Sequence, residues 1–220
     1  MHPFGRNQEG GALSPMDDRH LGLSSESTGD RPPRLSSTTP LLPFARAVSV
    51  AGNPLFLIPL TVAAVSQNWR WAVAIALTTT IPLVVIIARN VRRGTWSDFD
   101  VSRRDQRLGL YRAGLPLLLL ATAVLYFLDA SPRMLRGVAG GLLIFVAGVL
   151  GHRFLKLSMH MMFTTFCAVM LIWAYPWSAA AVIPFVALVA WSRRVLDRHT
   201  WAEIVIGTAI GAAAGFFAVL

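Results

Sequence analysis

Apolar residues come in long blocks along this chain. Six long runs contain no Asp, Glu, Lys or Arg: residues 47–67, 71–88, 113–128, 137–152, 157–192 and 204–220. A helix that crosses a bilayer needs roughly 17 to 25 predominantly apolar residues, which is close to the length of most of these runs. The pattern predicts an all-α integral membrane protein.

The longest run, residues 157–192, exceeds the length of one span and carries Tyr-Pro-Trp at residues 175–177. This tripeptide is typical of a tight turn at the membrane interface, so we expect a helix on either side of it. The runs 113–128 and 137–152 are short for full crossings, and they form either two spans or a re-entrant pair shielded by protein. The expected fold is an all-α membrane helical bundle of about six to seven transmembrane or re-entrant helices.

The first 42 residues have a different composition. They are rich in Ser, Pro, Gly and Arg, and they lack an apolar core whose burial would offset the entropy of ordering. We therefore expect a disordered tail over residues 1–42 and a membrane domain over residues 43–220. Because no apolar stretch follows the early charges before residue 41, we expect no cleaved secretory signal and an uncleaved first span as the anchor.

The formal net charge is +9, and many of the arginines flank the apolar runs. In a soluble protein this charge would suggest nucleic acid, but beside membrane spans it favours anionic lipid headgroups or a phosphate-bearing substrate. We therefore expect membrane lipids as partners and no nucleic acid. Cys167 is the only cysteine, which excludes an intrachain disulfide and favours a packed thiol.

Outside the tail, most charged residues belong to three polar clusters: residues 89–112, 151–160 and 191–207. Two apolar runs separate the first cluster from the second, and two more separate the second from the third. An even number of crossings returns the chain to the same membrane face, and this also holds if the short pair is re-entrant. We therefore expect the three clusters to meet on one face.

The charge asymmetry predicts the orientation of the bundle. We count the basic residues on each membrane face. On the face that carries the three clusters, the count omits the candidate ligands Arg107, Lys156 and Arg193. Nine basic residues then remain on this face, against Arg70, Arg133 and Arg136 on the other. By the positive-inside rule, we expect a multi-pass protein of the cell membrane with the clusters on the cytoplasmic side.

The third cluster contains a candidate for acid–base or nucleophilic chemistry. His199 and Glu203 are four residues apart, so they can meet on the first turn of a helix that starts at Thr200. A carboxylate bonded to one imidazole nitrogen fixes the tautomer and makes the other nitrogen a better nucleophile. Arg193, on the preceding helix, can fold back to bind an anion. The alternative is structural: Thr200 and Glu203 form a capping box, and His199 lies at headgroup level.

The second cluster favours the functional interpretation. Ser158 and His160 open the next span, where free backbone N–H groups at a helix N-terminus attract anions. His160 is a candidate acid for a leaving group. Histidine is costly at membrane depth, so two histidines at the starts of spans on one face indicate a functional site.

These residues resemble the motifs of a known family. Ser-Arg-x5-His-x3-Glu at residues 192–203 resembles S-R-x5-H-x3-D, the third signature of the type-2 phosphatidic acid phosphatase superfamily. That superfamily contains membrane lipid phosphate phosphatases and is related to the vanadium haloperoxidases. Leu-Ser-Met-His at residues 157–160 resembles its second signature, P-S-G-H, and residues 100–108 resemble its first, K-x6-R-P.

The resemblance implies a membrane phosphatase that hydrolyses the phosphomonoester of a lipid or polyprenyl phosphate. It implies that His199 attacks phosphorus to give a phosphohistidine, that Glu203 orients His199, and that His160 protonates the leaving alcohol. It also implies three ligands of the phosphoryl oxygens: Arg107, Ser158 and Arg193. It implies no metal and no cofactor.

Five positions depart from the signatures: Asp100, Leu108, Leu157, Met159 and Glu203. Asp100 stands where the family has lysine, which removes a phosphate contact that Lys156 or Arg104 would replace. The alternatives are a catalytically inactive member of the same fold and an anion or lipid transporter. The sequence does not specify the oligomeric state.

Two further patterns have structural and functional interpretations. Gly207, Gly211 and Gly215 recur every four residues and form a smooth helix face, for packing within the bundle or for dimerisation.

Asp98 and Asp100 are either a metal-binding pair or partners in salt bridges with the surrounding arginines, and the second interpretation is favoured.

Overall fold

The computed structural model describes residues 41–220 of the chain. The tail predicted for residues 1–42 lies outside the described residues, except for Leu41 and Leu42, which already belong to the first helix. The described part is helical and contains no strand. Its helices are α1 (Leu41–Ala51), α2 (Pro54–Ser66), α3 (Trp69–Ile75), a π-helical turn (Ala76–Thr80), α4 (Ile81–Arg92), α5 (Arg107–Phe127), α6 (Pro132–Gly151), α7 (Met159–Ala174), a 3-10 turn (Pro176–Ser178), α8 (Ala179–Val195) and α9 (Trp201–Val219).

Five helices of this part are long and apolar enough to cross a membrane: Trp69–Arg92, Arg107–Phe127, Pro132–Gly151, Pro176–Val195 and Trp201–Val219. The bent pair α1 and α2 provides a sixth if it counts as one span, and α7 is a shorter apolar helix. The expected all-α membrane bundle is confirmed. The two short runs form the full-length helices α5 and α6 rather than a re-entrant pair, and the longest run divides into α7 and α8 at the predicted turn.

The first apolar run is not one straight helix, because the chain bends by 50° between α1 and α2. Asn53 caps α2 by accepting a hydrogen bond from the backbone N–H of Leu55, and Pro54 occupies the first turn of α2. A Cβ atom on Gly52 would lie 2.7 Å from the Val189 side chain. The bend therefore depends on a cap, a proline and a close approach to α8.

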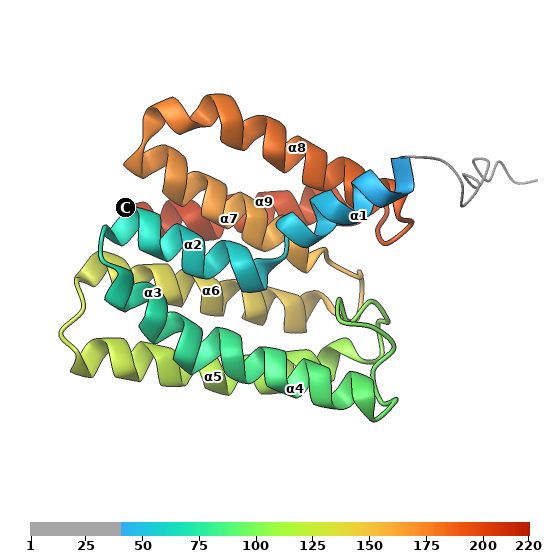
Figure 1. Ribbon diagram of the computed structural model, residues 1–220, viewed down its shortest axis with the longest axis horizontal. Helices are drawn as coiled ribbons and strands as arrows, with labels where there is room; N and C mark the ends of the chain where they lie inside the picture. The colour runs from blue at the N-terminus through green and yellow to red at the C-terminus, as the bar shows by residue number, and fades with distance from the viewer. Residues whose placement is uncertain (1–40) are drawn as a thin grey trace, which may run out of the picture. The chain divides into compact units, whose positions relative to one another are not determined.

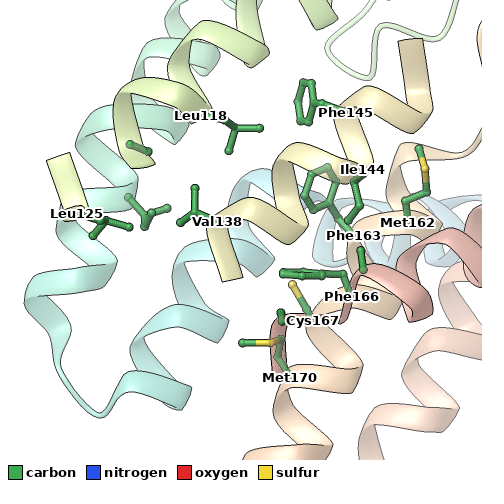
Figure 2. Packing of buried hydrophobic residues seen from close by; sticks show 14 of the residues in the cluster. Leu118, Leu125, Val138, Ile144, Phe145, Met162, Phe163, Phe166, Cys167 and Met170 are labelled. Carbon is green, nitrogen blue, oxygen red and sulfur yellow. The ribbon is translucent and has the colours of Figure 1, made fainter. Parts of the chain in front are cut away.

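α7 lies at the centre of the bundle and packs against α2, α8 and α9 (Figure 1). α9 also packs against α6, α6 against α5, and α5 against the segment α3–α4, while α1 lies on α8. Figure 2 shows the main core, where Phe145 of α6 meets Phe163 of α7, and Phe163 in turn meets Phe166. The ring centroids are 5.9 Å apart in the Phe145–Phe163 pair and 6.4 Å apart in the Phe163–Phe166 pair. In both pairs the rings cross at a steep angle, an arrangement that aromatic pairs prefer. Cys167 is a buried free thiol in the same core, as expected.

The glycine face of α9 packs within the bundle, which confirms one of the two interpretations of its spacing. A Cβ atom on Gly211 would collide with the carbonyl oxygen of Met162 in α7, and a Cβ on Gly215 would lie 2.7 Å from Val169. Gly207 faces the carbonyl oxygen of Ser158. Small residues thus allow α9 to approach the α7 backbone and fix the start of α7 against the start of α9.

Replacing Gly211 with alanine is expected to lower the free energy of unfolding by about 1 to 3 kcal/mol, because the added methyl group overpacks the α7–α9 contact. Thermal unfolding of the purified protein in detergent measures this effect. The matched control is Gly137→Ala in α6, where the nearest atom to the new Cβ, in Met170, is 3.9 Å away. Equal unfolding midpoints for the two variants would contradict the predicted role of Gly211.

The three polar clusters meet at one end of the bundle, as the crossing parity predicts. Both Arg104 Nε and Nη2 donate to the carbonyl oxygen of His152, at 2.9 and 2.6 Å. Lys156 Nζ donates to the carbonyl oxygen of Arg198 at 2.9 Å. In Figure 1 the loops before α5, before α7 and before α9 lie together beside α1. We refer to this end of the bundle as the polar end.

Candidate active site

The turn between α8 and α9 places His199 at the polar end. α8 ends at Val195, and Asp197 has a left-handed backbone with φ of 51°. This conformation turns the chain back, so that the N–H groups of Arg198 and His199 both donate to the carbonyl oxygen of Arg193, at 3.0 and 3.3 Å. Arg193 and His199 are thereby fixed relative to each other although they belong to different segments.

Glu203 has two roles at the start of α9. Its Oε2 accepts a hydrogen bond from the Thr200 N–H at 3.0 Å, and Thr200 Oγ1 accepts from the Glu203 N–H at 3.3 Å, which forms the predicted capping box. The same Oε2 lies 3.1 Å from His199 Nδ1. The predicted capping box and the predicted contact between His199 and Glu203 are therefore both present.

The surroundings of His199 specify which ring nitrogen carries the proton. The side chain is buried, and Nδ1 lies 3.1 Å from both Glu203 Oε2 and the carbonyl oxygen of Lys156. Two acceptors at Nδ1 favour the tautomer with the proton on that nitrogen. Nε2 then carries the lone pair, and it lies 3.5 Å from Arg107 Nη2. This unprotonated nitrogen thus faces a guanidinium that can hold an anion.

The charge state of His199 also suits a nucleophile. Burial and the neighbouring cations Arg107, Arg193 and Lys156 lower the pKa of His199 to about 2. Desolvation and nearby positive charge both disfavour the imidazolium. The imidazole is therefore neutral at physiological pH, which is the form that can attack phosphorus.

Arg107 joins the clusters at the first residue of α5. Its guanidinium is buried, donates from Nη1 to the carbonyl oxygen of Leu157, and directs Nη2 toward His199. Ser158, the residue after Leu157, is fully buried and caps α7, with its Oγ accepting from the Met161 N–H at 3.4 Å. The start of α7 therefore lies next to the His199–Arg107 pair.

His160 and Arg193 lie on the other side of the site, around Asp100. Arg193 Nη1 donates to Asp100 Oδ2 at 2.9 Å and to Ser49 Oγ at 2.6 Å. His160 Nε2 lies 3.9 Å from Asp100 Oδ1 and has no hydrogen-bond partner among the described residues. Burial raises the pKa of the Asp100 carboxyl, but His160 and Arg193 outweigh burial and hold that pKa below its ordinary value.

Ser49 and Asp100 belong to the site although no sequence pattern placed them there. Ser49 lies in α1, inside an apolar run with no motif around it, so no sequence signal marks it. Asp100 was recognised as a departure from a signature and as a salt-bridge partner of nearby arginines, but not as a member of the site, and its contact with Arg193 spans 93 positions of the chain. Asp98 pairs with Arg198 at 3.4 Å, so both aspartates form salt bridges, as favoured above.

Arg104 and Lys156, the two candidate substitutes for the signature lysine that Asp100 replaces, differ in position. Arg104 is exposed, and its guanidinium binds the His152 carbonyl oxygen, so the structure does not bring it into the site. Lys156 is half-buried at the edge of the site, where its backbone oxygen contacts His199. Burial and the nearby Arg107 charge lower the pKa of Lys156.

An apolar cavity of about 640 Å³ reaches the candidate site at Asp100 and His160. Asp100 and His160 lie on its wall together with apolar side chains from α2, α4, α5 and α7. These include Leu55, Ile58, Leu83, Leu110, Phe163 and Phe166. A molecule with a charged head and a long apolar tail fits this combination, because the head can bind cations while the tail is removed from water.

Residues 41–220 contain no group of three or more His, Cys, Asp or Glu side chains placed to hold a metal ion. The side chains gathered at the polar end supply a neutral imidazole, a carboxylate that orients it, a second imidazole and buried guanidinium groups. Such an arrangement can bind a phosphoryl group and transfer it to nitrogen. Comparison of the chain with protein-family models, with curated proteins and with solved structures finds no match.

Proposed function

We propose that this protein is a membrane phosphatase that hydrolyses a lipid or polyprenyl phosphate through a phosphohistidine intermediate. The observation that supports this most directly is the geometry of His199, whose Nδ1 is held by Glu203 and whose Nε2 faces Arg107. The order and spacing of the three signature-like motifs support the same function. The polar end is proposed to face the cytoplasm of the cell, from its excess of arginine.

In the first step, His199 Nε2 attacks phosphorus, a P–N bond forms, and the bond from phosphorus to the lipid oxygen breaks. The negative charge of the bound phosphoryl group favours the protonated form of His160, which donates its proton to that oxygen, so the lipid leaves as an alcohol. Arg107 and Arg193 hold the phosphoryl oxygens, where negative charge accumulates in the transition state. The Ser158 hydroxyl group and the backbone N–H groups at the N-terminus of α7 are further donors to the phosphoryl oxygens.

In the second step, water attacks the phosphohistidine while His160 takes up a proton from it. The P–N bond breaks, inorganic phosphate leaves, and His199 returns to the neutral imidazole. Glu203 stabilises the histidine throughout by accepting a hydrogen bond from Nδ1–H, and the proton stays on the ring. The alcohol product is apolar and can return to the bilayer from the cavity.

The substrate class is tested by phosphate release from purified protein in detergent. The panel contains lipid phosphates, a polyprenyl phosphate and a short water-soluble phosphomonoester. We expect the long-chain substrates to give a kcat/KM at least about a hundredfold above the soluble one, because their tails bind the apolar cavity. Release from none of the lipids would contradict the proposed function and favour an inactive member of the same fold.

A lipid or anion transporter is the second candidate function. It is favoured by the extent of the cavity, whose wall also includes Arg133 and Arg136 near the start of α6. A carrier would move a labelled lipid phosphate across a proteoliposome membrane without releasing phosphate. Flux that persists in a His199→Ala variant would favour transport over hydrolysis.

Replacing Glu203 with glutamine is expected to lower kcat by about ten- to a hundredfold with little change in thermal stability. Glutamine can retain the capping box, so α9 still starts at Trp201. It cannot supply the negative charge that stabilises the ring as His199 becomes phosphorylated. Phosphate release and thermal unfolding are measured on the same preparation, and an unchanged kcat would refute the orienting role.

Replacing Lys156 with alanine is expected to lower kcat/KM by about tenfold, because its ammonium group lies at the edge of the site. Arg104→Ala is the matched control and should stay within about twofold of the wild type, since this exposed side chain binds the His152 carbonyl oxygen instead. Full activity of the Lys156 variant would show that this lysine is no substitute for the missing one.

A further inference from the structure

The carboxylate of Asp100 lies where the candidate site would bind an anion. Its Oδ2 is 2.9 Å from Arg193 Nη1, and its Oδ1 is 3.9 Å from His160 Nε2. Arg193 is a proposed ligand of a phosphoryl oxygen, and His160 is the proposed acid beside the leaving oxygen. Carboxylate and phosphate oxygens bind guanidinium groups in the same way, so Asp100 and a phosphoryl group require the same position.

The loop holds Asp100 at this position from both sides. Arg198 Nη1 binds Asp98 at 3.4 Å and also donates to the Ser102 hydroxyl, which ties the loop to the turn before α9. Val101 is fully buried and has a φ of 46°, a left-handed conformation that is a genuine outlier for a β-branched residue. Such strain persists only where the surrounding structure imposes it. The backbone position of Asp100 beside Arg193 is therefore a fixed feature of the fold.

Asp100 also reduces the positive charge available to a substrate. The cations Arg107, Lys156 and Arg193 are gathered around His199. Glu203 is engaged by His199 and by the start of α9, whereas Asp100 binds the Arg193 guanidinium directly. A phosphate monoester that approaches Arg193 therefore meets a guanidinium that already has an anionic partner.

We infer that Asp100 is an internal anion that occupies the phosphoryl position at Arg193, so that a phosphoryl group binds there only by displacing this carboxylate. This inference rests on the function proposed above. The Asp100 side chain is 23% exposed and lines the cavity, so rotation about its side-chain bonds moves the carboxylate without moving the loop. When phosphate leaves, the carboxylate returns to Arg193.

This competition makes Asp100 a specificity-determining residue. It weakens the binding of every phosphoryl group. Only a substrate with a long apolar chain recovers the lost binding free energy, through contacts of that chain in the cavity. Inorganic phosphate and small soluble phosphomonoesters lack that chain, so the site excludes them. Inorganic phosphate is also a product of the proposed reaction, and its weak binding would favour release.

The test is a calorimetric titration of inorganic phosphate into purified full-length protein in detergent. We expect Asp100→Asn to bind phosphate at least about tenfold more tightly than the wild type, because the competing charge is removed. Asp105→Asn is the matched control and should leave the affinity unchanged, since Asp105 is exposed and pairs with Arg103. The gain should disappear in an Asp100→Asn, Arg193→Ala double variant.

Equal or weaker phosphate binding by Asp100→Asn would overturn the inference, and weaker binding would indicate that Asp100 positions Arg193 for the substrate. Absence of binding in both proteins would overturn it too. Asp100→Ser retains a hydrogen-bonding group without the charge and gives a second measurement if the asparagine variant folds poorly. The titration requires no turnover, so failure of wild-type protein to release phosphate from lipids would count against the proposed function alone.

Discussion

Replacing His199 with alanine is expected to reduce phosphate release from a lipid phosphate by about a thousandfold or more. The variant loses the nitrogen that forms the P–N bond, and no other histidine of the described residues is held by a carboxylate as closely as the 3.1 Å between His199 and Glu203. The bundle should still fold, because Thr200 and Glu203 retain the capping box of α9. The rate is measured with purified protein and checked against thermal unfolding.

His152→Ala is the matched control for this variant. His152 lies at the same polar end, and its contact with Arg104 is made by its backbone oxygen, which the substitution retains. We expect activity within about twofold of the wild type. A His199 variant as active as the His152 variant would exclude His199 as the nucleophile.

Replacing Arg193 with alanine is expected to lower kcat/KM by about a hundred- to a thousandfold, as the loss of a donor to transition-state charge does. Its guanidinium is almost completely buried, so water cannot easily substitute for it, and its Nε has no hydrogen-bond partner among the described residues. Arg193→Lys should recover only part of the activity, because an ammonium group lacks the planar fork that binds two oxygens.

Arg194→Ala provides the comparison for Arg193. The two arginines are adjacent in α8, but Arg194 pairs with the exposed Asp197 at the surface. The surface pair contributes little free energy, so this variant should retain activity and thermal stability. Similar losses in the two variants would show that positive charge at the polar end is needed in general, and that Arg193 has no specific role.

The sequence predicted the fold well because membrane helices are defined by local composition. The long runs, the turn at residues 175–177 and the placement of the polar clusters at one end follow from run length and crossing number alone. The bend between α1 and α2 was not predicted. Asn53 and Pro54 are local signals for a helix start, but the bend also depends on the close approach of Gly52 to Val189, a tertiary contact that no local pattern encodes.

The candidate site was predictable where its residues are close in the chain. His199 and Glu203 meet because they are one helical turn apart, and their spacing is visible in the sequence. The partners of Arg193 are not visible in this way, since Ser49 and Asp100 come from distant segments. Arg104 shows the opposite case: a basic residue within a signature-like motif, whose side chain the fold directs away from the site.

The most direct test of the account is to trap the phosphoenzyme. Purified protein is mixed with a lipid phosphate labelled with ³²P and quenched in alkali within one turnover, and the protein-bound label is located by peptide mapping. We expect alkali-stable, acid-labile phosphate on the peptide containing His199, and none in a His199→Ala variant. Turnover by the wild type without any protein-bound phosphate, or label on another residue, would contradict it.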